Sequence, residues 1–468
     1  MKFRTEKDSL GAKKVPASAY YGIFTQRALE NFPISGWKPD REFPYSIAEI
    51  KLAAAQANME LKVIARRVGK AIVKAAREVL AGKFDGEFVL DAFSAGAGTP
   101  FNMLLNEVIA NRANELLGGK KGEYDRVHPN DHVNLGQSSN DVIPTAIRIT
   151  CLKLLKKLLG DVLSVVEACA QKGERFRKIL KSARTHLQDA VPITLGQELE
   201  AYASAMLRSL IRITKASEAM HDLGLGGTAA GTGINSHPRY ADLVIKKLRQ
   251  ISGLRLNPHG NLVEATSSMA DFMELANALD EYAMELNRLS NDLRLLASGP
   301  YTGLNEIRLP EVEPGSSIMP GKVNPSIPEM VNMACFHVFG SVQAIRCAVQ
   351  GGQLDLNVFT PTIAFHLHSS MRILGNASRV LAEKCLQGMG ANEAACQRYF
   401  EHSAGIATAL TPAIGYAKAA ELVKEAEEEG KSVREMLISG SGLSRAELEK
   451  WLDPEALTHP NLKRKKDL

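Results

Sequence analysis

Residues 272–296 read FMELANALDEYAMELNRLSNDLRLL, and this stretch decides the fold. Its apolar residues recur at intervals that alternate between three and four, which is the pattern of helices packed side by side. The stretch lies between Pro258 and Pro300, and a helix of roughly 35 residues there would be about 50 Å long. A rod of that length must bury its apolar stripe against other rods. The stripe consists of Phe272, Leu275, Leu279, Tyr282, Leu286, Leu289, Leu293 and Leu296.

Four other stretches repeat this spacing and predict further helices. One of them, residues 142–183, is interrupted by Gly160 and Gly173. No alternating run of β-branched residues is long enough for a central sheet, although short strands near the N-terminus or in loops fit the sequence. We therefore predict a mainly α protein with a central bundle of about five long helices. The other three stretches are residues 194–221 after Pro192, the residues after Pro328 and the residues after Pro361.

Shorter segments flank the predicted bundle. The N-terminal part mixes turns rich in Gly and Pro with helices such as residues 47–68. The C-terminal part divides into short helices, two of which are entered at Ser432 and Ser444, and Glu447 completes a capping-box pattern with Ser444. We expect three domains: a mixed, mostly helical domain at residues 1–139, the long-helix bundle at 140–392 and a small helical domain at 393–468.

The composition is that of an ordinary soluble globular protein. The chain has 468 residues, of which 45% are hydrophobic, 23% charged and only 6% aromatic. Its net charge of +5 comes partly from the run Lys-Arg-Lys-Lys at residues 463–466. We interpret this run as a solvated tail, because a nucleic-acid partner would require a broader basic face with aromatic residues. We expect neither a nucleic-acid nor a membrane partner.

Six cysteines lie in apolar helical stretches without CxxC spacing. This pattern indicates reduced, buried thiols rather than disulfides or a metal site. The first eight residues contain no apolar signal region, and no apolar run is long enough to cross a bilayer. We therefore expect a cytoplasmic protein. The cysteines are Cys151, Cys169, Cys335, Cys347, Cys385 and Cys396.

Residues 315–325, GSSIMPGKVNP, are an irregular segment with an unusual polar content. Two glycines give the backbone freedom and two prolines make it rigid. The segment also carries two hydroxyls, an ammonium group and a carboxamide, which a simple connection does not require. Such a segment can close over an anion. From these residues alone, an active-site lid and an irregular connection are both open.

Three more polar segments precede it, and we number all four in chain order. The second segment, residues 136–141, stands at a predicted helix start. Free N–H groups and the helix dipole favour a carboxylate there, although the same residues also fit a simple helix cap. In the third segment, His186 taken alone fits a structural role as well as a catalytic one. The first is residues 96–102 (GAGTPFN), the second 136–141 (GQSSND), the third 183–189 (ARTHLQD) and the fourth 315–325.

The fourth segment resembles the signature of the aspartase/fumarase superfamily in every position. The resemblance covers nearly the whole chain in the same order, and the second, third and fourth segments resemble the three homologous blocks of that superfamily. It implies a homotetramer around a core of about twenty helices, with four composite sites that each draw one block from each of three subunits.

The resemblance gives residues of the fourth segment the central roles. Ser316 would be the general base, an alkoxide that takes a proton from the carbon next to a carboxylate. N–H groups of the loop, expected from Ile318 and Met319, and the nearby Lys322 would lower the pKa of this serine. Lys322 and Asn324 would hold the carboxylate whose charge grows in the aci-carboxylate intermediate.

The other site residues follow from the same resemblance. His186 and Glu329 are expected to form a pair and to act with Ser316 and Lys322 as the catalytic residues. This chemistry requires no metal and no organic cofactor. The remaining residues would bind substrate: Thr99, Ser138, Ser139 and Ser317 the other carboxylate, and Asn140, Thr185 and His186 the leaving group.

Elimination of ammonia and elimination of water share this scaffold, and finer stretches favour the aspartase branch. We predict reversible elimination of ammonia from L-aspartate to give fumarate. Fumarate hydratase, which adds water to fumarate to give L-malate, is the alternative, because residues 138–140 have the fumarase form. A non-catalytic, crystallin-like protein is a remote third, since a scaffold has no reason to keep Ser316, Lys322, Asn324, His186 and Glu329. The aspartase-like stretches are residues 291–300, 352–358, 430–435 and 457–460.

Several features leave the substrate range and regulation open. The pair Pro100-Phe101 replaces a smaller and more polar pair of both subfamilies, and Tyr301 stands where arginine is usual. Both would change size or charge near the site. Residues 126–131 resemble a secondary anion site of the family, whose role is open, as are the role of the basic tail and any activation by metal or substrate.

Overall fold

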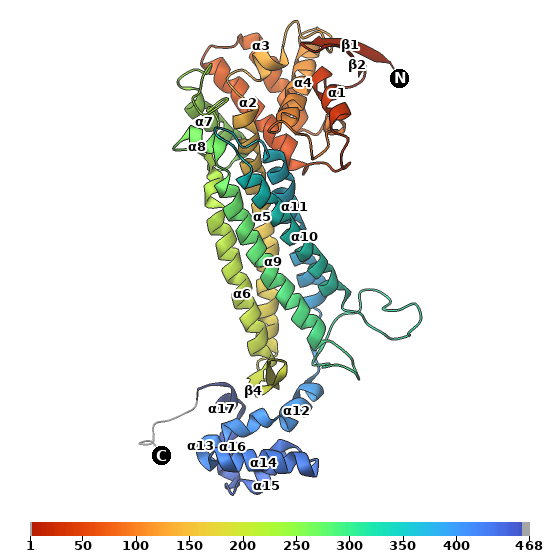
Figure 1. Cartoon of the computed structure of the whole chain (residues 1–468), viewed down its shortest axis with the longest axis vertical. Helices are drawn as coiled ribbons and strands as arrows, with labels where there is room; N and C mark the ends of the chain where they lie inside the picture. The colour runs from red at the N-terminus through yellow and green to blue at the C-terminus, as the bar shows by residue number, and fades with distance from the viewer. Residues whose placement is uncertain (1, 461–468) are drawn as a thin grey trace. The chain divides into compact units, whose positions relative to one another are not determined.

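The computed structural model describes residues 2–460, so the basic run at 463–466 lies outside the described residues. Helices dominate, and the strands of the described part form four two-stranded pairings (Figure 1). The prediction of a mainly α fold without a central sheet is confirmed. None of the helices in residues 2–460 combines the length and the apolarity that a membrane crossing requires.

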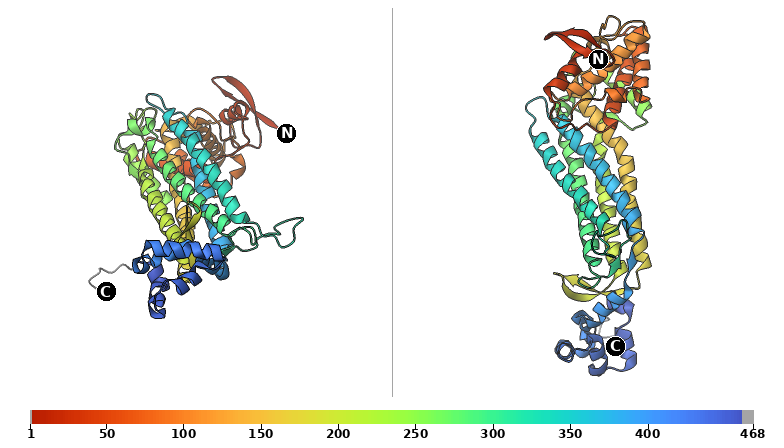
Figure 2. Two further views of the ribbon diagram at one scale, coloured as in Figure 1. Left: turned by 60° about the horizontal axis from the view of Figure 1, so that its bottom comes forward. Right: turned by 90° about the vertical axis from the view of Figure 1, so that its right-hand side faces the viewer.

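Five long helices are present, as expected. The stripe of α9 is buried along its length, from Phe272 to Leu296, although α9 itself has 27 residues rather than roughly 35. The chain groups into two compact units, and within each unit the portions of these helices run side by side (Figures 1 and 2). The five are α5 (Ser139–Arg175), α6 (Leu195–Ala216), α9 (Ala270–Leu296), α10 (Ser326–Gln350) and α11 (Thr360–Leu381).

The interruptions expected at Gly160 and Gly173 are wrong, because α5 continues through both for 37 residues. A helical glycine costs only about 1 kcal/mol relative to alanine, and packing outweighs it. Gly173 has a further reason, because a Cβ on it would lie 2.7 Å from Cγ of Glu200 in α6, and a Cβ on Gly196 of α6 would lie 2.5 Å from the Gly173 carbonyl oxygen. Glycines therefore let α5 and α6 approach closely.

The first unit holds the described residues up to Leu159, Ile211–Ala283 and Phe336–Gly375. The helix expected at residues 47–68 is wrong in its limits: α2 ends at Glu60, Lys62 takes a positive φ of 61°, and α3 then begins. The unit's shorter elements are β1 (Phe3–Asp8), β2 (Gly11–Pro16), α1 (Ile23–Asn31), α2 (Glu42–Glu60), α3 (Arg66–Leu80), η1 (Asp85–Glu87), α4 (Thr99–Leu116), η2 (Pro129–Val133), η3 (Glu218–His221), β5 (Asp222–Leu223), α7 (Tyr240–Ser252), β6 (Asn257–Pro258) and α8 (Leu262–Ser267).

The second unit holds Gly160–Leu210, Met284–Cys335 and the described residues from Asn376 onward. Both predicted helix entries near its end carry full capping boxes, Ser432 with Glu435 and Ser444 with Glu447. The unit's shorter elements are β3 (Leu180–Thr185), β4 (Gln188–Thr194), β7 (Ile307–Arg308), η4 (Ala382–Leu386), β8 (Gly390–Ala391), α12 (Glu393–His402), η5 (Ala404–Ala409), α13 (Thr411–Ile414), α14 (Tyr416–Glu429), α15 (Val433–Gly440), α16 (Arg445–Trp451) and α17 (Pro454–Thr458).

All six cysteines are unpaired. Five are buried as expected, whereas Cys347 on α10 is exposed, which corrects the expectation that every thiol is buried. The division into three domains at residues 139 and 392 stays a prediction.

Candidate functional site

The fourth polar segment forms the loop between β7 and α10. Its geometry depends on Gly315, because a Cβ there would lie 1.7 Å from the carbonyl oxygen of Lys322. The two ends of the loop therefore touch, and the carboxamide N–H of Asn324 donates to the carbonyl oxygen of Gly315. Only glycine permits this approach.

The hydroxyl of Ser316 lies at two backbone N–H donors. Its Oγ accepts the backbone N–H groups of Met319 (2.9 Å) and Ile318 (3.2 Å), the two donors expected from the sequence. Two N–H dipoles aimed at one hydroxyl oxygen stabilise negative charge on that oxygen. The arrangement can therefore support an alkoxide.

The one cation of residues 315–325 is exposed. Among the described residues, the ammonium group of Lys322 has no hydrogen-bond or ion-pair partner, and it is exposed, as is Ser317. Lys322, Asn324 and Tyr301 line a cavity of about 550 Å³. Tyr301 is 97% exposed. An unpaired ammonium group at the edge of a cavity is suited to an anionic ligand.

The third polar segment is the tip of the hairpin formed by β3 and β4. His186 and Leu187 take φ values of 56° and 59°, so the two-residue turn has positive φ at both central positions, as tight hairpins do. Thr185 and His186 are exposed at this tip. Sequence reasoning did not anticipate the hairpin, although its short strands match the allowance for strands in loops.

The predicted His186–Glu329 pair does not form within one chain. Among residues 2–460, no hydrogen bond or ion pair joins the two side chains, and both are exposed. Glu329 lies in the first turn of α10. Within one chain, Thr185 and His186 likewise form no such bond with Ser316, Lys322 or Asn324. The pair therefore stays a prediction for neighbouring chains.

The second polar segment forms the start of α5, as predicted. Asp141 organises it, because its carboxylate accepts N–H groups from Ser138 (2.9 Å), Gly226 (3.0 Å) and Thr228 (3.0 Å). Burial raises the pKa of the Asp141 carboxyl to about 6. Ser139 is buried, and its Oγ accepts an N–H of Asn102 (3.0 Å). This bond joins the second segment to the first.

Lys51 lies beneath the second segment and was missed by sequence reasoning. Its ammonium group donates to Asn134 Oδ1 and Gln137 Oε1, both at 2.9 Å, and no part of the residue is exposed. Burial lowers the pKa of this ammonium group to about 7. The available signal was a lysine inside the otherwise apolar run at residues 50–55, where an unpaired charge would not be tolerated.

The first polar segment places Thr99 at the start of α4, after Gly98 in the left-handed conformation. Thr99 lines a cavity of about 850 Å³ together with His128 and Asn130. The turn at residues 126–131, which resembles a secondary anion site, therefore shares a cavity with a predicted substrate-binding residue.

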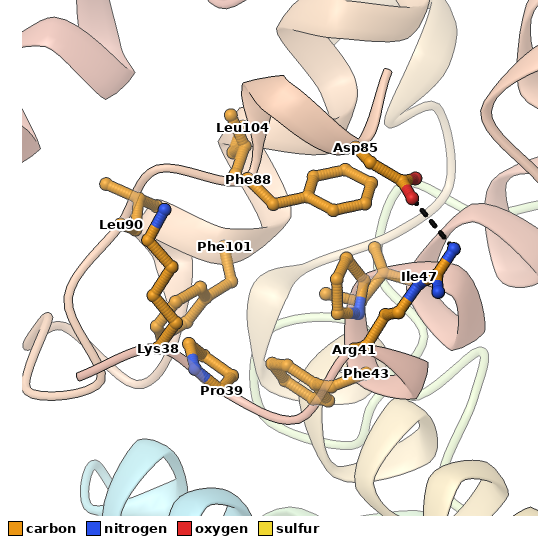
Figure 3. Close-up of a pocket in the computed structure, with 11 residues that line it drawn as sticks. Lys38, Pro39, Arg41, Phe43, Ile47, Asp85, Phe88, Leu90, Phe101 and Leu104 are labelled. Atoms are coloured by element: carbon orange, nitrogen blue, oxygen red, sulfur yellow. Dashed lines mark hydrogen bonds and ion pairs between the residues drawn. The ribbon is translucent and has the colours of Figure 1, made fainter. Parts of the chain in front are cut away.

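Phe101 lines a different cavity, of about 230 Å³ (Figure 3). Its ring meets that of Phe43 edge-on at 5.8 Å, and only 5% of the residue is exposed. Arg41 and Asp85 form an ion pair of 2.9 Å beside the same cavity. Phe101 is thus a core residue of the first unit, and its influence on Thr99 must pass through α4.

Comparison with known protein families identifies the chain as a lyase. The model of a family described as lyase matches residues 11–340, and that of the fumarase C C-terminus matches residues 406–459. The chain belongs to this lyase family, within the aspartase/fumarase superfamily.

The chain is similar over its length to curated aspartate ammonia-lyases. It is 46% identical to that of Bacillus subtilis (strain 168), covering 98% of this chain and 97% of the relative. It is 48% identical to that of Pseudomonas canavaninivorans, covering 98% of each. Among solved structures, a fumarate lyase:delta crystallin from Brucella melitensis bound to cobalt has a TM-score of 0.94 at 45% identity, covering 98% of this chain and all of that one.

Proposed function

We propose that the protein is a carbon–nitrogen lyase that reversibly eliminates ammonia from L-aspartate to give fumarate. The observation that carries the proposal is the 44–48% identity to aspartate ammonia-lyases over 98–99% of the chain. The two N–H groups at Ser316 Oγ supply matching chemistry, because the reaction must begin by removing a proton from carbon.

The proposed reaction uses the residues of the loop in sequence. Ser316 Oγ, as the alkoxide, takes a proton from the β-carbon of L-aspartate, which is next to the side-chain carboxylate. The electron pair of that C–H bond moves into the carboxylate and gives a dianionic aci-carboxylate, which Lys322 and Asn324 hold. The electrons then return to form the double bond of fumarate as the C–N bond breaks and the ammonium group of the substrate leaves as ammonia.

The remaining predicted residues would orient the substrate. Thr99, Ser138, Ser139 and Ser317 are proposed to hold the second carboxylate. Ser139 is fixed by Asn102, and its neighbours lie at the start of α5, where the helix dipole favours an anion. Asn140, Thr185 and His186 are proposed to contact the leaving amine, with Glu329 of another chain facing His186.

We propose a homotetramer in which each site takes the second, third and fourth segments from three different subunits. Exposed apolar side chains on the long helices support this assembly, because large exposed apolar surface marks an interface. The absence of any bond between His186 and Glu329 within residues 2–460 of one chain also fits shared sites. The exposed residues include Leu207, Ile211, Met284, Met333 and Phe336. The unpaired thiols support a cytoplasmic location.

Fumarate hydratase is the second candidate. The Ser-Ser-Asn form at residues 138–140 favours it. The chain is also similar to a recombinant class II fumarase from Schistosoma mansoni, with a TM-score of 0.93 at 37% identity, covering 98% of this chain and all of that one.

Fumarate consumption separates the two candidates. Purified protein is incubated with fumarate and ammonium, and in parallel with fumarate alone, while the absorbance of the fumarate double bond is followed. We expect loss of absorbance only with ammonium. Loss in both mixtures would make the protein a hydratase, and no change in either would refute both activities.

A further inference from the structure

Four buried or half-buried charges meet at the base of the β3–β4 hairpin. The ammonium group of Lys181 lies 2.7 Å from a carboxylate oxygen of Glu198 and 2.7 Å from one of Glu306. The guanidinium group of Arg184 lies 2.9 Å from the other oxygen of Glu306. We call these residues the charge quartet. Its two cations balance its two carboxylates.

Glu306 is the centre of the quartet. Its side chain is fully buried, and that of Lys181 is 1% exposed. Burying charges costs free energy that an ion pair recovers only through good geometry, so the quartet is weak evidence for extra stability. Removing Glu306 takes away the one carboxylate that Lys181 and Arg184 share and leaves an uncompensated cation, whereas removing Arg184 leaves Glu306 paired with Lys181.

The backbone of Glu306 is fixed as firmly as its side chain. Its N–H donates to the carbonyl oxygen of Leu296 at the end of α9 (2.9 Å), and its carbonyl oxygen accepts the N–H of Asn392 (2.8 Å). The next two residues form β7, which pairs with β8. Glu306 is therefore an anchor from which the chain continues to the fourth polar segment, ten residues before Ser316.

The third polar segment is held by Glu306 as well, through Arg184. Arg184, which binds Glu306, directly precedes Thr185 and His186 at the hairpin tip. The guanidinium group of Arg184 also stacks over the ring of Tyr399 in α12, 5.5 Å from its centroid. The buried carboxylate of Glu306 thus lies at the point in the chain from which both the third and the fourth polar segments extend.

We propose that Glu306 is a positioning residue for the third and fourth polar segments at once. The inference rests on the proposed function and on its shared sites. In such a tetramer, the two segments of one subunit serve different sites, so one altered Glu306 damages a contribution to two sites. A subunit that carries this change should keep its second polar segment intact.

Mixed tetramers test this inference. Pairs of differently tagged subunits are co-expressed, tetramers with both tags are purified, and fumarate release from L-aspartate is measured. The reference subunits each disable one segment: Asn140→Ala the second, Thr185→Ala with His186→Ala the third, and Ser316→Ala the fourth. Mixing the third-segment and fourth-segment references should restore about one quarter of wild-type activity. When subunits mix at random, an intact third segment and an intact fourth segment meet at one site in four.

The Glu306→Gln subunit should show a distinctive pattern. We expect no recovery with the third-segment or the fourth-segment reference, because it lacks both contributions. With the Asn140→Ala reference, we expect recovery to about one eighth of wild-type activity, which shows that the subunit folds, assembles and supplies its second segment. Glu306→Asp, which keeps a shorter carboxylate, is assayed in the same mixtures. We expect it to recover some activity with the third-segment and fourth-segment references, but less than a wild-type subunit does. This variant keeps the test available if Glu306→Gln does not assemble.

Arg184→Gln is the matched control, because it removes only the hairpin side of the quartet. It should recover with Ser316→Ala and fail with the third-segment reference. Recovery of Glu306→Gln with Ser316→Ala or with the third-segment reference overturns the inference, and so does recovery of Glu306→Asp to the level that a wild-type subunit gives in the same mixtures. Failure of the two reference subunits to restore each other overturns it as well. A wild type that acts on L-malate alone refutes the proposed function, and the same mixtures assayed on L-malate then still test the inference.

Discussion

Ser316 is the residue on which the proposed chemistry depends. Ser316→Ala should lower kcat by a factor of about 10²–10⁴, the usual contribution of a general base. Unfolding temperature and assembly should stay unchanged, because the loop is largely exposed. Steady-state kinetics with L-aspartate and a thermal melt measure both effects.

Ser317→Ala is the matched control for this prediction. Its hydroxyl is proposed to bind a carboxylate and not to take a proton, so its removal should mainly raise KM. An Ser316→Ala enzyme with kcat near the wild-type value would refute the assignment of the base.

Lys51 should give the protein a pH-dependent stability. Burial lowers its pKa from 10.5 to about 7, so its stabilising contribution is complete above pH 10.5 and is lost as the pH falls toward 7. Relative to Lys51→Met, the wild type should lose up to about 4 kcal/mol of unfolding free energy between pH 10 and pH 7, at about 1.4 kcal/mol per unit.

Urea unfolding of wild type and Lys51→Met at one protein concentration measures this difference. The pH range avoids Asp141, whose pKa is raised to about 6 and whose contribution is lost as the pH rises from about 4 through 6. A difference that does not change between pH 7 and pH 10 would contradict the burial of a titrating amine.

The sequence predicted part of the site at this scale. The N–H donors of Ile318 and Met319 could be anticipated, because a serine in a short Gly- and Pro-bounded loop can reach only nearby backbone groups. Lys51 and Glu306 could not, because their partners lie 83 or more residues away for Lys51, and 122 or more away for Glu306. Only the fold brings such partners together.

At the scale of elements, the two kinds of glycine in and around α5 should behave oppositely. A Cβ on Gly160 would meet nothing within 4 Å, so Gly160→Ala should raise unfolding free energy by about 0.5–1 kcal/mol through helix propensity. A Cβ on Gly196 would lie 2.5 Å from the Gly173 carbonyl oxygen, so Gly196→Ala should lower it by about 1–3 kcal/mol.

Thermal or urea unfolding of the two variants measures this contrast. A destabilised Gly160→Ala together with an unaffected Gly196→Ala would contradict the close approach of α5 and α6.

The same glycines explain where the helix prediction failed. The stripe of α9 was predictable because its spacing alone defines a buried face. The continuity of α5 was not, because a glycine that ends a helix and one that admits a neighbouring helix look alike in sequence. The hairpin at His186 was also missed, because its tight turn uses His and Leu rather than the Asn or Gly that usually mark such turns.

At the scale of the whole molecule, the proposed tetramer should have a mass near four times 50.8 kDa by light scattering. Met333→Asp with Phe336→Asp places charges on an exposed apolar part of α10 and should break the assembly. Activity should be lost with it, because the sites are proposed to be shared.

Ile438→Asp is the control for this prediction. Ile438 is 50% exposed but lies on the short helix α15, so its substitution should leave mass and activity unchanged. An α10 variant that is active as a monomer would contradict shared sites.

The identity of the leaving group is measured in the forward reaction. The measurement is fumarate release by the purified protein from L-aspartate and, separately, from L-malate, each expressed as kcat/KM. We expect release from L-aspartate with a kcat/KM about 10³-fold or more above that for L-malate, because acceptors placed for the three N–H donors of an ammonium group are partly unpaired with a hydroxyl, which has one donor. Release from L-malate without release from L-aspartate would contradict it.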